Sequence, residues 1–208
     1  MNPIKSVILS ILGGMCISLG ATAFLSLDNK VLGAIFFSVG LFTILTFGFN
    51  LYTGKVCYVF ENDKAYALNI AVIWIGNLLG AIVTAFVEKL TRFGPALMEK
   101  AQTIAEAKLS DNLLSIFILS ILCNIMIYIA VDGYKNNPHE VGKYLAVFFG
   151  VTIFIICGFE HSVANMYYFS MAGAWSPKTL LYEIVMTAGN AVGGFMIPQL
   201  KRLMAKYD

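Results

Sequence analysis

The chain has 208 residues, of which 59% are hydrophobic and only 12% are charged. Charged residues make up about a quarter of ordinary soluble proteins, and the formal net charge of +2 is too small to indicate nucleic acid as a partner. Long runs carry no charge, and each reaches or approaches the roughly 20 residues that a helix needs to cross a bilayer. These runs are residues 7–27, 31–47, 65–87 and 113–131. The composition predicts a polytopic membrane protein with one integral domain over residues 1–208, and it leaves no stretch long enough for a separate soluble domain.

The first apolar run, residues 7–27, could be mistaken for a secretory signal peptide. It is longer than the roughly 7–15 apolar residues of such a signal, and no small-residue cleavage site bounds it cleanly. We therefore interpret it as the first membrane span.

Six spanning units can be drawn along the chain, and four of them are simple: the N-terminal run and residues 65–87, 113–131 and 180–200. The other two units, residues 31–60 and 144–175, are interrupted by "GFNLYTGK" and "GFEHSVAN". Each is too long for one straight helix and too short for two spans. We expect a broken helix in each, because irregular backbone is tolerated at membrane depth only when it is buried in protein or lines a wet cavity.

The two interruptions resemble each other in sequence and in position. Gly48 opens "GFN" in the second unit, and Gly158 opens "GFE" in the fifth. The repeat therefore comprises three spans plus three, and an odd repeat length inverts the second copy. Paired glycine-interrupted segments in corresponding halves point to a substrate pathway. We predict an all-α integral membrane protein of six transmembrane helices, arranged as a 3+3 inverted repeat with helices 2 and 5 broken.

The connection at residues 88–111 contains a second kind of helix. Leu97, Ala101, Ile104 and Ala105 share one helical face. We expect a short amphipathic helix that lies at the membrane surface.

The orientation in the membrane depends on how lysine and arginine are distributed. Six spans place both termini on one side, and the two sides carry nearly equal numbers of basic residues. Those between Arg92 and Lys108 lie in a longer connection and count less. The bias then favours a cytoplasmic-membrane protein with both termini in the cytoplasm.

Chemistry-bearing side chains gather at the two interruptions. Ionisable groups inside a span are costly and are usually functional, which favours a pore-facing role for His161. For Glu160 we favour a bracing role, because a carboxylate accepts the N–H groups that irregular backbone leaves free. In the other interruption, Asn50 and Thr53 could hold loop backbone or donate to a passing solute. Lys55 adds positive charge, or it snorkels to an interface.

No enzymatic or metal-binding pattern is present in the sequence. "EH" reverses the start of a zinc-protease motif, and the other histidine, His139, lies in a polar loop. There is no GxSxG, no phosphate-binding loop and no paired-carboxylate arrangement within the membrane. The four cysteines lie in apolar segments without CxxC spacing, which is typical of reduced thiols: Cys16, Cys57, Cys123 and Cys157. We predict no catalytic residue, no metal and no cofactor.

"GFEHSVANMYYF" closely resembles the signature of the formate/nitrite transporter family, and "NLYTG" looks like that family's first broken-helix loop. The resemblance covers essentially the whole chain. It implies an aquaporin-like protomer in a homopentamer, with one pore per protomer, which conducts small monovalent anions or their acids: formate, nitrite, lactate-like monocarboxylates or hydrosulfide. Protons and the lipid bilayer would be the other partners.

The resemblance also implies roles for individual residues. His161 looks like the central pore histidine and Thr53 like its partner, while Lys108, Asn124 and Asn190 resemble further polar pore residues. The apolar constrictions would be formed by Phe37, Leu41, Leu51 and Phe154, which without the resemblance would be interpreted as ordinary core packing. This chain departs from the family at Asn50, where an acidic residue is usual, and at Lys55, where many members carry a small polar residue.

The sequence therefore predicts a passive or proton-coupled pore. Two alternatives stay open: a membrane scaffold or sensor that does not transport, and a channel for neutral small solutes. The paired Asn-Pro-Ala loops of aquaporins are absent, and the two Asn-Pro pairs, which begin at Asn2 and Asn137, lie outside the interruptions.

Overall fold

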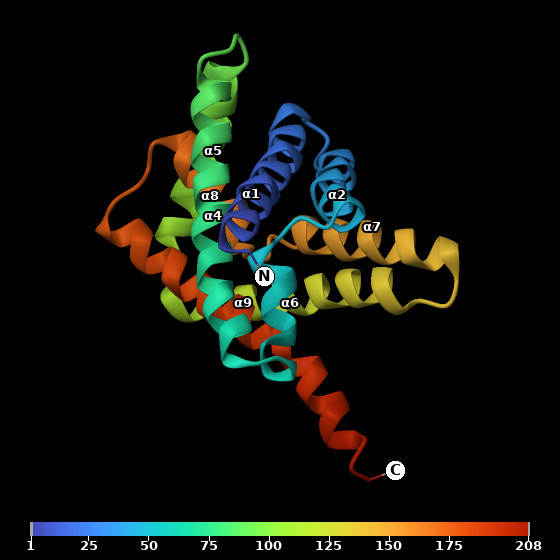
Figure 1. The fold of residues 1–208 in the computed structure, drawn as a ribbon. Helices are drawn as coiled ribbons and strands as arrows, with labels where there is room; N and C mark the ends of the chain where they lie inside the picture. The colour runs from blue at the N-terminus through green and yellow to red at the C-terminus, as the bar shows by residue number, and fades with distance from the viewer. Residues whose placement is uncertain (1, 208) are drawn as a thin grey trace.

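The computed structural model describes residues 2–207 and contains only helices and their connections (Figure 1). In chain order the helices are α1 (Pro3–Ser26), α2 (Lys30–Phe47), α3 (Tyr52–Lys55), the 3-10 helix η1 (Val56–Glu61), α4 (Lys64–Lys89), α5 (Gly94–Ser110), α6 (Leu113–Asn136), α7 (Glu140–Ile156), α8 (Ser162–Ala172) and α9 (Pro177–Met204). Within the described residues, 5 helices are long and apolar enough to cross a membrane: α1, α2, α4, α6 and α9. The prediction of an all-helical protein with long apolar spans is confirmed.

The two halves of the chain use the same order of neighbours. Helix α1 packs against α4 and α2, and in the second half α6 packs against α9 and α7 (Figure 1). The halves meet where α2 contacts α7 and where α4 contacts α8. This arrangement brings the ends of α2 and α7, and therefore the two predicted interruptions, toward the middle of the bundle.

Polar residues in the short connections begin the long helices. The side chain of Asn29 accepts hydrogen bonds from the N–H groups of Val31 and Leu32, both at 3.0 Å. Asp63 accepts from Tyr66 N–H at 2.9 Å at the start of α4. Such caps satisfy backbone donors that have no partner within the helix.

Both predicted breaks are present, and a glycine permits each of them. Helix α2 ends at Gly48 and α7 is followed by Gly158, with φ of 71° and 70°. This left-handed conformation is readily accessible only to glycine. On either side of the second break, α7 and α8 have 17 and 11 residues, so neither is a full span alone. Past the first break, the short helix α3 and η1 continue the chain.

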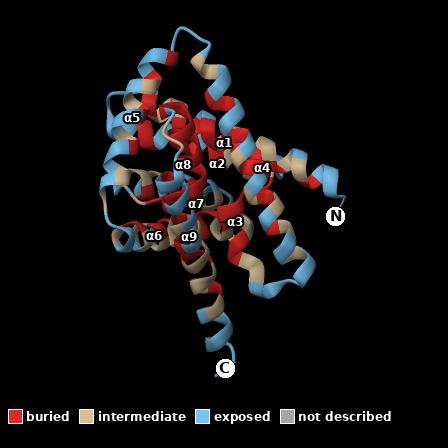
Figure 2. Cartoon of the chain, turned by 90° about the vertical axis from the view of Figure 1, so that its left-hand side faces the viewer, coloured by how far each residue is buried: buried red, intermediate tan, exposed pale blue. Residues whose placement is uncertain are grey.

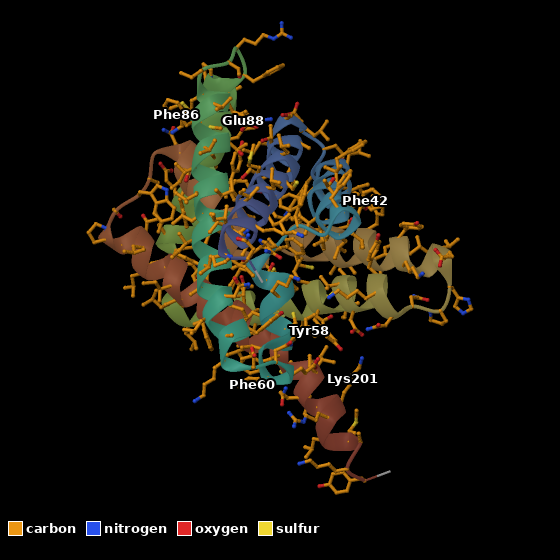
Figure 3. All side chains as sticks on the ribbon, in the orientation of Figure 1. Phe42, Tyr58, Phe60, Phe86, Glu88 and Lys201 are labelled. Carbon is orange, nitrogen blue, oxygen red and sulfur yellow. The ribbon has the colours of Figure 1, made fainter. Side chains whose placement is uncertain are left out.

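The core lies around the breaks, and the rim of the bundle is apolar. Every residue of α8 is buried, and the buried segments gather at the centre of the view in Figure 2. Large apolar side chains on the long helices face outward instead, as Phe86 on α4 does with 63% of its surface exposed (Figure 3). An apolar exterior over a packed interior is what a bilayer requires of a spanning bundle.

The connection at residues 88–111 departs from its prediction in one respect. Helix α5 forms there and buries Leu97, Ala101 and Ala105, which belong to the predicted face. That face packs against α8, a partner that the sequence analysis did not name. Burying alanines allows α5 to approach α8 closely, so the connection becomes part of the wall around the second break.

Candidate functional site

The two broken helices bring one polar pair together in the core. Thr53 on α3 and His161, which caps α8, lie with Oγ1 and Nε2 3.0 Å apart. Their exposed fractions are 0% and 2%. The residues are 108 positions apart in sequence, so the pair exists only because the two breaks meet.

The local backbone determines which nitrogen of His161 carries hydrogen. The N–H of Ala164 donates to His161 Nδ1 at 3.1 Å, because His161 occupies the N-cap position of α8. A nitrogen that accepts a hydrogen bond carries no hydrogen, so the neutral ring is protonated at Nε2. The Nε2–H then donates to the hydroxyl of Thr53. Full protonation of the ring would require the Ala164 bond to break.

Two asparagines hold the two loops by equivalent contacts. Asn77 on α4 accepts from Tyr52 N–H at 2.8 Å, and its Nδ2 donates to the carbonyls of Ser10 and Asn50 at 2.7 and 2.9 Å. Asn190 on α9 accepts from Ser162 N–H at 2.9 Å and donates to the carbonyls of Ser120 and Glu160, both at 2.8 Å. Each side chain thus satisfies a backbone donor and an acceptor that the break leaves free.

Asn77 was missed by the sequence analysis, although a signal for it exists. The stretch "GNLLG" at Asn77 and the stretch "GNAVG" at Asn190 share the spacing Gly-Asn-x-x-Gly in the corresponding helices of the two halves. The structure places Asn190 as a brace whose amide faces loop backbone. It does not line either of the cavities described below.

Glu160 holds two partners beside the second break. Its Oε2 accepts from Lys108 Nζ at 2.5 Å and from Asn165 Nδ2 at 2.7 Å. The side chains of Lys108 and Glu160 are 14% and 5% exposed. Lys108 comes from the end of α5, so this ion pair joins α5 to the loop that positions His161. Both donors to the carboxylate are side chains, whereas the sequence analysis expected backbone N–H groups, and the ion pair offsets much of the lysine charge.

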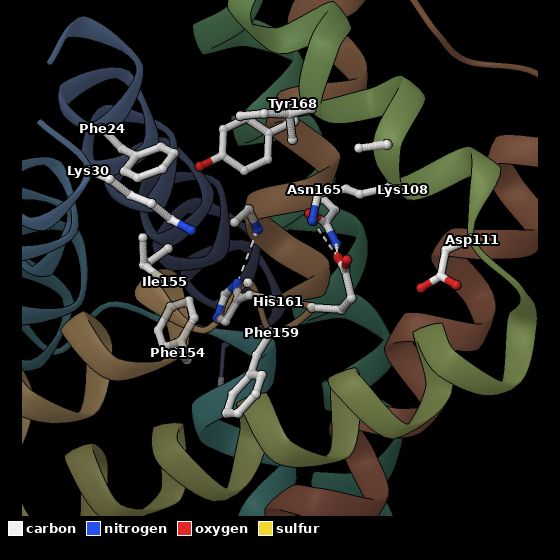
Figure 4. Close-up of a pocket in the computed structure, with 15 residues that line it drawn as sticks. Phe24, Lys30, Lys108, Asp111, Phe154, Ile155, Phe159, His161, Asn165 and Tyr168 are labelled. Carbon is white, nitrogen blue, oxygen red and sulfur yellow. Dashed lines mark hydrogen bonds and ion pairs between the residues drawn. The ribbon is translucent and has the colours of Figure 1, made fainter. Parts of the chain in front are cut away.

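A cavity of about 370 Å³ reaches His161 from the side of α5 (Figure 4). His161 and Phe154 lie at its inner end, and Glu160, Lys108 and Lys30 line its walls. The ring of Phe154 stacks on that of His161 with centroids 5.4 Å apart.

A second cavity, of about 100 Å³, lies at the other end of α2. Leu41, Leu51, Lys55 and Lys135 are among the residues that line it. Because Lys30 opens α2 and Gly48 ends it, the two cavities approach the core from opposite ends of that helix.

The predicted constriction residues are buried: Phe154 lines the larger cavity, Leu41 and Leu51 line the smaller one, and Phe37 packs against Phe154. Phe37, Leu41, Leu51 and Phe154 are each at most 2% exposed. The rings of Phe37 and Phe154 meet edge to face with centroids 5.9 Å apart. Two apolar rings therefore follow one another beside the histidine of the polar pair.

The remaining predicted polar residues contact backbone. Asn124 Nδ2 donates to the carbonyl of Thr53 at 3.0 Å, and its Oδ1 is buried without a partner in the described part of the chain. The backbone N–H of Asn50 donates to the carbonyl of Leu9 at 3.1 Å, and the carbonyl of Asn50 accepts from Asn77 Nδ2 at 2.9 Å. The side-chain Nδ2 of Asn50 donates to the carbonyl of Ser6 at 3.4 Å. Asn124 lines neither of these two cavities, whereas Asn50 lines a third cavity of about 560 Å³ together with Lys55 and Asp63. Residues 2–207 contain no group of three or more His, Cys, Asp or Glu side chains that could hold a metal ion.

Comparison with known proteins agrees with this geometry. The family described as formate/nitrite transporter matches residues 1–203. The chain belongs to the formate/nitrite transporter family. It is therefore a multi-pass membrane protein of a family of channels, and not an enzyme.

Relatives within the family cover most of the chain. It is 31% identical to the uncharacterized transporter YrhG of Bacillus subtilis (strain 168) over 181 residues, which are 80% of this chain and 68% of YrhG. It is 27% identical to the formate channel FocA of Escherichia coli (strain K12) over 191 residues, 82% of this chain and 67% of FocA. The nitrite transporter NirC of the same strain is 26% identical over 191 residues, 82% of this chain and 69% of NirC.

Solved structures share the fold. A "pentameric formate channel with formate bound" superposes with a TM-score of 0.82 at 24% identity, over 99% of this chain and 98% of that one. An ion channel of the same family gives a TM-score of 0.87 at 23% identity, over 98% and 91%. The protomer of a pentameric channel thus has the fold of this chain.

Proposed function

We propose that this protein is a pore for small monovalent anions or their weak acids, with formate, nitrite and hydrosulfide as the candidate substrates. Relatives named as a formate channel and a nitrite transporter support formate and nitrite. Hydrosulfide is included because it is also small and monovalent and has a neutral acid form.

One observation carries this proposal: a buried pair of hydrogen-bonding groups lies between two cavities that approach from opposite ends. The Thr53–His161 contact of 3.0 Å is the polar point between them. A solute that leaves the larger cavity passes Phe154 and Phe37, meets the pair, and then reaches Leu41 and Leu51 at the smaller cavity. The side chains named along this route are apolar except at the pair.

The mechanism follows from the cost of burying charge. A bare anion loses most of its hydration between apolar side chains, which is highly unfavourable. The Nε2–H of His161 and the hydroxyl of Thr53 replace part of that hydration, since both can donate to an anionic oxygen or sulfur. A neutral acid crosses the apolar stretches at a much smaller cost. Proton transfer through His161 would require its ring to release Ala164, because imidazolium carries hydrogen on both nitrogens.

We further propose the assembly that this function requires. Helices α7 and α8 together form a sixth crossing, and the protomer is an aquaporin-like 3+3 inverted repeat. The equivalent bracing by Asn77 and Asn190 supports the repeat. The protein acts as a homopentamer with one pore per protomer in the cytoplasmic membrane, with both termini in the cytoplasm. The similarity to a pentameric formate channel supports the oligomer.

The experiment is solute flux into liposomes that contain the purified protein. Formate, nitrite, hydrosulfide and glycerol are compared in one preparation across pH, with His161→Phe and His161→Asn beside the wild type. We expect anion flux to exceed glycerol flux, and both variants to lose flux or its pH dependence. A wild type that conducts no anion would indicate a scaffold or sensor, and glycerol flux above anion flux would indicate a neutral-solute channel. Either result overturns the proposal, and variants with wild-type flux and pH profile would remove His161 from the mechanism.

A further inference from the structure

We propose that the smaller cavity is an anion-gathering site built from Lys55 and Lys135, and that it supplies the pore with small monovalent anions from that end. This inference rests on the proposed function. It assigns a role to Lys135, which the sequence analysis left aside, and it pairs that residue with Lys55.

Two lysines from different elements line one small cavity. Lys55 ends α3 at the first break, and Lys135 lies in the last turn of α6. The remaining lining residues are apolar or glycine, and none is acidic: Leu41, Ile44, Leu45, Gly48, Phe49, Leu51, Gly54 and Val131. Two cationic side chains therefore line an otherwise apolar cavity.

Neither lysine is neutralised by a carboxylate. In residues 2–207, no acidic oxygen lies within 4.0 Å of either ammonium group. Lys135 is placed over the ring of Tyr58, with Nζ 4.4 Å from the ring centroid. This contact orients the ammonium group without removing its charge. Lys55 is half-buried, and its carbonyl accepts from Tyr66 OH at 2.8 Å, which holds the backbone that carries it.

The acidic residue closest in sequence to Lys135 has another partner. Asp132, one turn earlier on α6, lies 3.3 Å from Lys201 of α9. Figure 3 shows Tyr58 and Lys201 at the same end of the molecule. The aspartate thus pairs with Lys201 and not with Lys135.

The larger cavity contrasts with this one. Its lining includes two lysines, Lys30 and Lys108, but also two carboxylates, Asp111 and Glu160. Lys108 and Glu160 form the 2.5 Å ion pair described above. The charges that line the larger cavity therefore balance formally, while those of the smaller cavity sum to two positive charges.

An uncompensated ammonium group raises the local concentration of anions. At a separation of about 6 Å, one unit charge favours an anion roughly threefold even at the dielectric constant of water, and two such charges favour it roughly tenfold. The effect falls with ionic strength, because the screening length shrinks from about 30 Å at 0.01 M to about 3 Å at 1 M salt. A gathering site of this kind alters how much anion is required for half-maximal flux more than it alters the maximal rate.

The test uses formate as the probe in liposomes that contain the purified protein. Initial uptake is measured against formate concentration, at about 10 mM and about 1 M of an impermeant salt, for Lys55→Gln, Lys135→Gln and the double variant. Lys55→Arg and Lys135→Arg retain the charge. Lys64→Gln serves as the matched control, because Lys64 is exposed at the start of α4 and lines neither cavity.

We expect each glutamine variant to raise the formate concentration for half-maximal flux about threefold at low salt, and the double variant about tenfold. The arginine variants and Lys64→Gln should match the wild type, and all variants should converge in high salt. Unchanged concentration dependence at low salt would overturn the inference, as would a change that persists in 1 M salt, since screening should abolish it. If Lys55→Gln fails to assemble, Lys135→Gln decides alone, because Lys135 is exposed. A wild type without formate flux would overturn the proposed function instead, and this inference with it.

Discussion

Replacing Asn190 by alanine tests whether the second break depends on one side chain. Asn190 is fully buried, and its amide makes three hydrogen bonds to backbone. The N–H of Ser162 has its partner in Asn190, because the first N–H groups of a helix have no intrahelical acceptor. The carbonyl of Glu160 accepts from the same amide at 2.8 Å.

The magnitude follows from the groups that the substitution leaves without partners. A buried polar group that loses its partner costs about 1–3 kcal/mol. Two such groups, the Ser162 N–H and the Glu160 carbonyl, give a loss of about 2–6 kcal/mol in the free energy of unfolding. The carbonyl of Ser120 lies inside α6 and keeps its helical partner, so it adds little. For a chain of this size, a loss of about 3 kcal/mol lowers the unfolding midpoint by roughly 6–12 °C.

The assay is thermal unfolding of the purified protein in detergent, followed by gel filtration and by formate flux. Asn77→Ala should give a similar loss, because Asn77 makes the equivalent contacts at the first break. Val192→Ala is the control, since Val192 is half-exposed two positions further along α9. Asn190→Asp keeps the acceptor but cannot donate to the two carbonyls, so it should be destabilised as well. An Asn190→Ala protein that unfolds at the same temperature as the control would refute the reasoning.

Three further predictions concern the neighbouring residues. Thr53→Val keeps the shape of the side chain but removes the hydroxyl, so we expect formate flux to fall about tenfold. Thr53→Ser retains the hydroxyl and should retain the flux. Equal flux in the two variants would exclude a role for the hydroxyl. Glu160→Gln leaves Lys108 buried without its counter-charge and should destabilise the protein by about 3–5 kcal/mol in thermal unfolding. The double variant with Lys108→Met should recover part of that loss, and no recovery would contradict the ion-pair argument. Gly158→Ala should lower the free energy of unfolding by about 1–2 kcal/mol, because an alanine is strained in the left-handed backbone conformation of this position. Its Cβ would meet no atom within 4 Å, so no steric clash adds to that loss. An unchanged unfolding midpoint would contradict this estimate.

The positions of the breaks could be predicted from sequence because they follow from local chemistry. A long apolar unit with a central glycine and polar residues has few ways to satisfy its backbone in a bilayer. The positions of Gly48 and Gly158 therefore predict both breaks from sequence alone, and both glycines adopt positive φ. The histidine and threonine were singled out for a similar reason, since polar groups at membrane depth need partners.

What holds the loops could not be predicted in the same way. Asn77 and Asn190 lie inside regular helices, and a buried asparagine in an apolar helix has no preferred role until its neighbours are known. The ion pair between Lys108 and Glu160 could not be predicted either, because it joins α5 to the second break across 52 positions of sequence. The same holds for α5, whose apolar face was identified correctly while its partner, α8, was not.

The sequence by itself determined the class of protein, the places where helices must break, and the polar side chains at those places. These features depend on composition, hydrophobic run length and the backbone freedom of glycine, all of which act within a few residues. Only the tertiary structure decided that Thr53 meets His161, that one cavity is lined by balanced charges and the other by two free lysines, and that asparagines brace both loops. Those outcomes depend on contacts between segments that lie from 25 to 108 residues apart, which only the packing of the helices brings together.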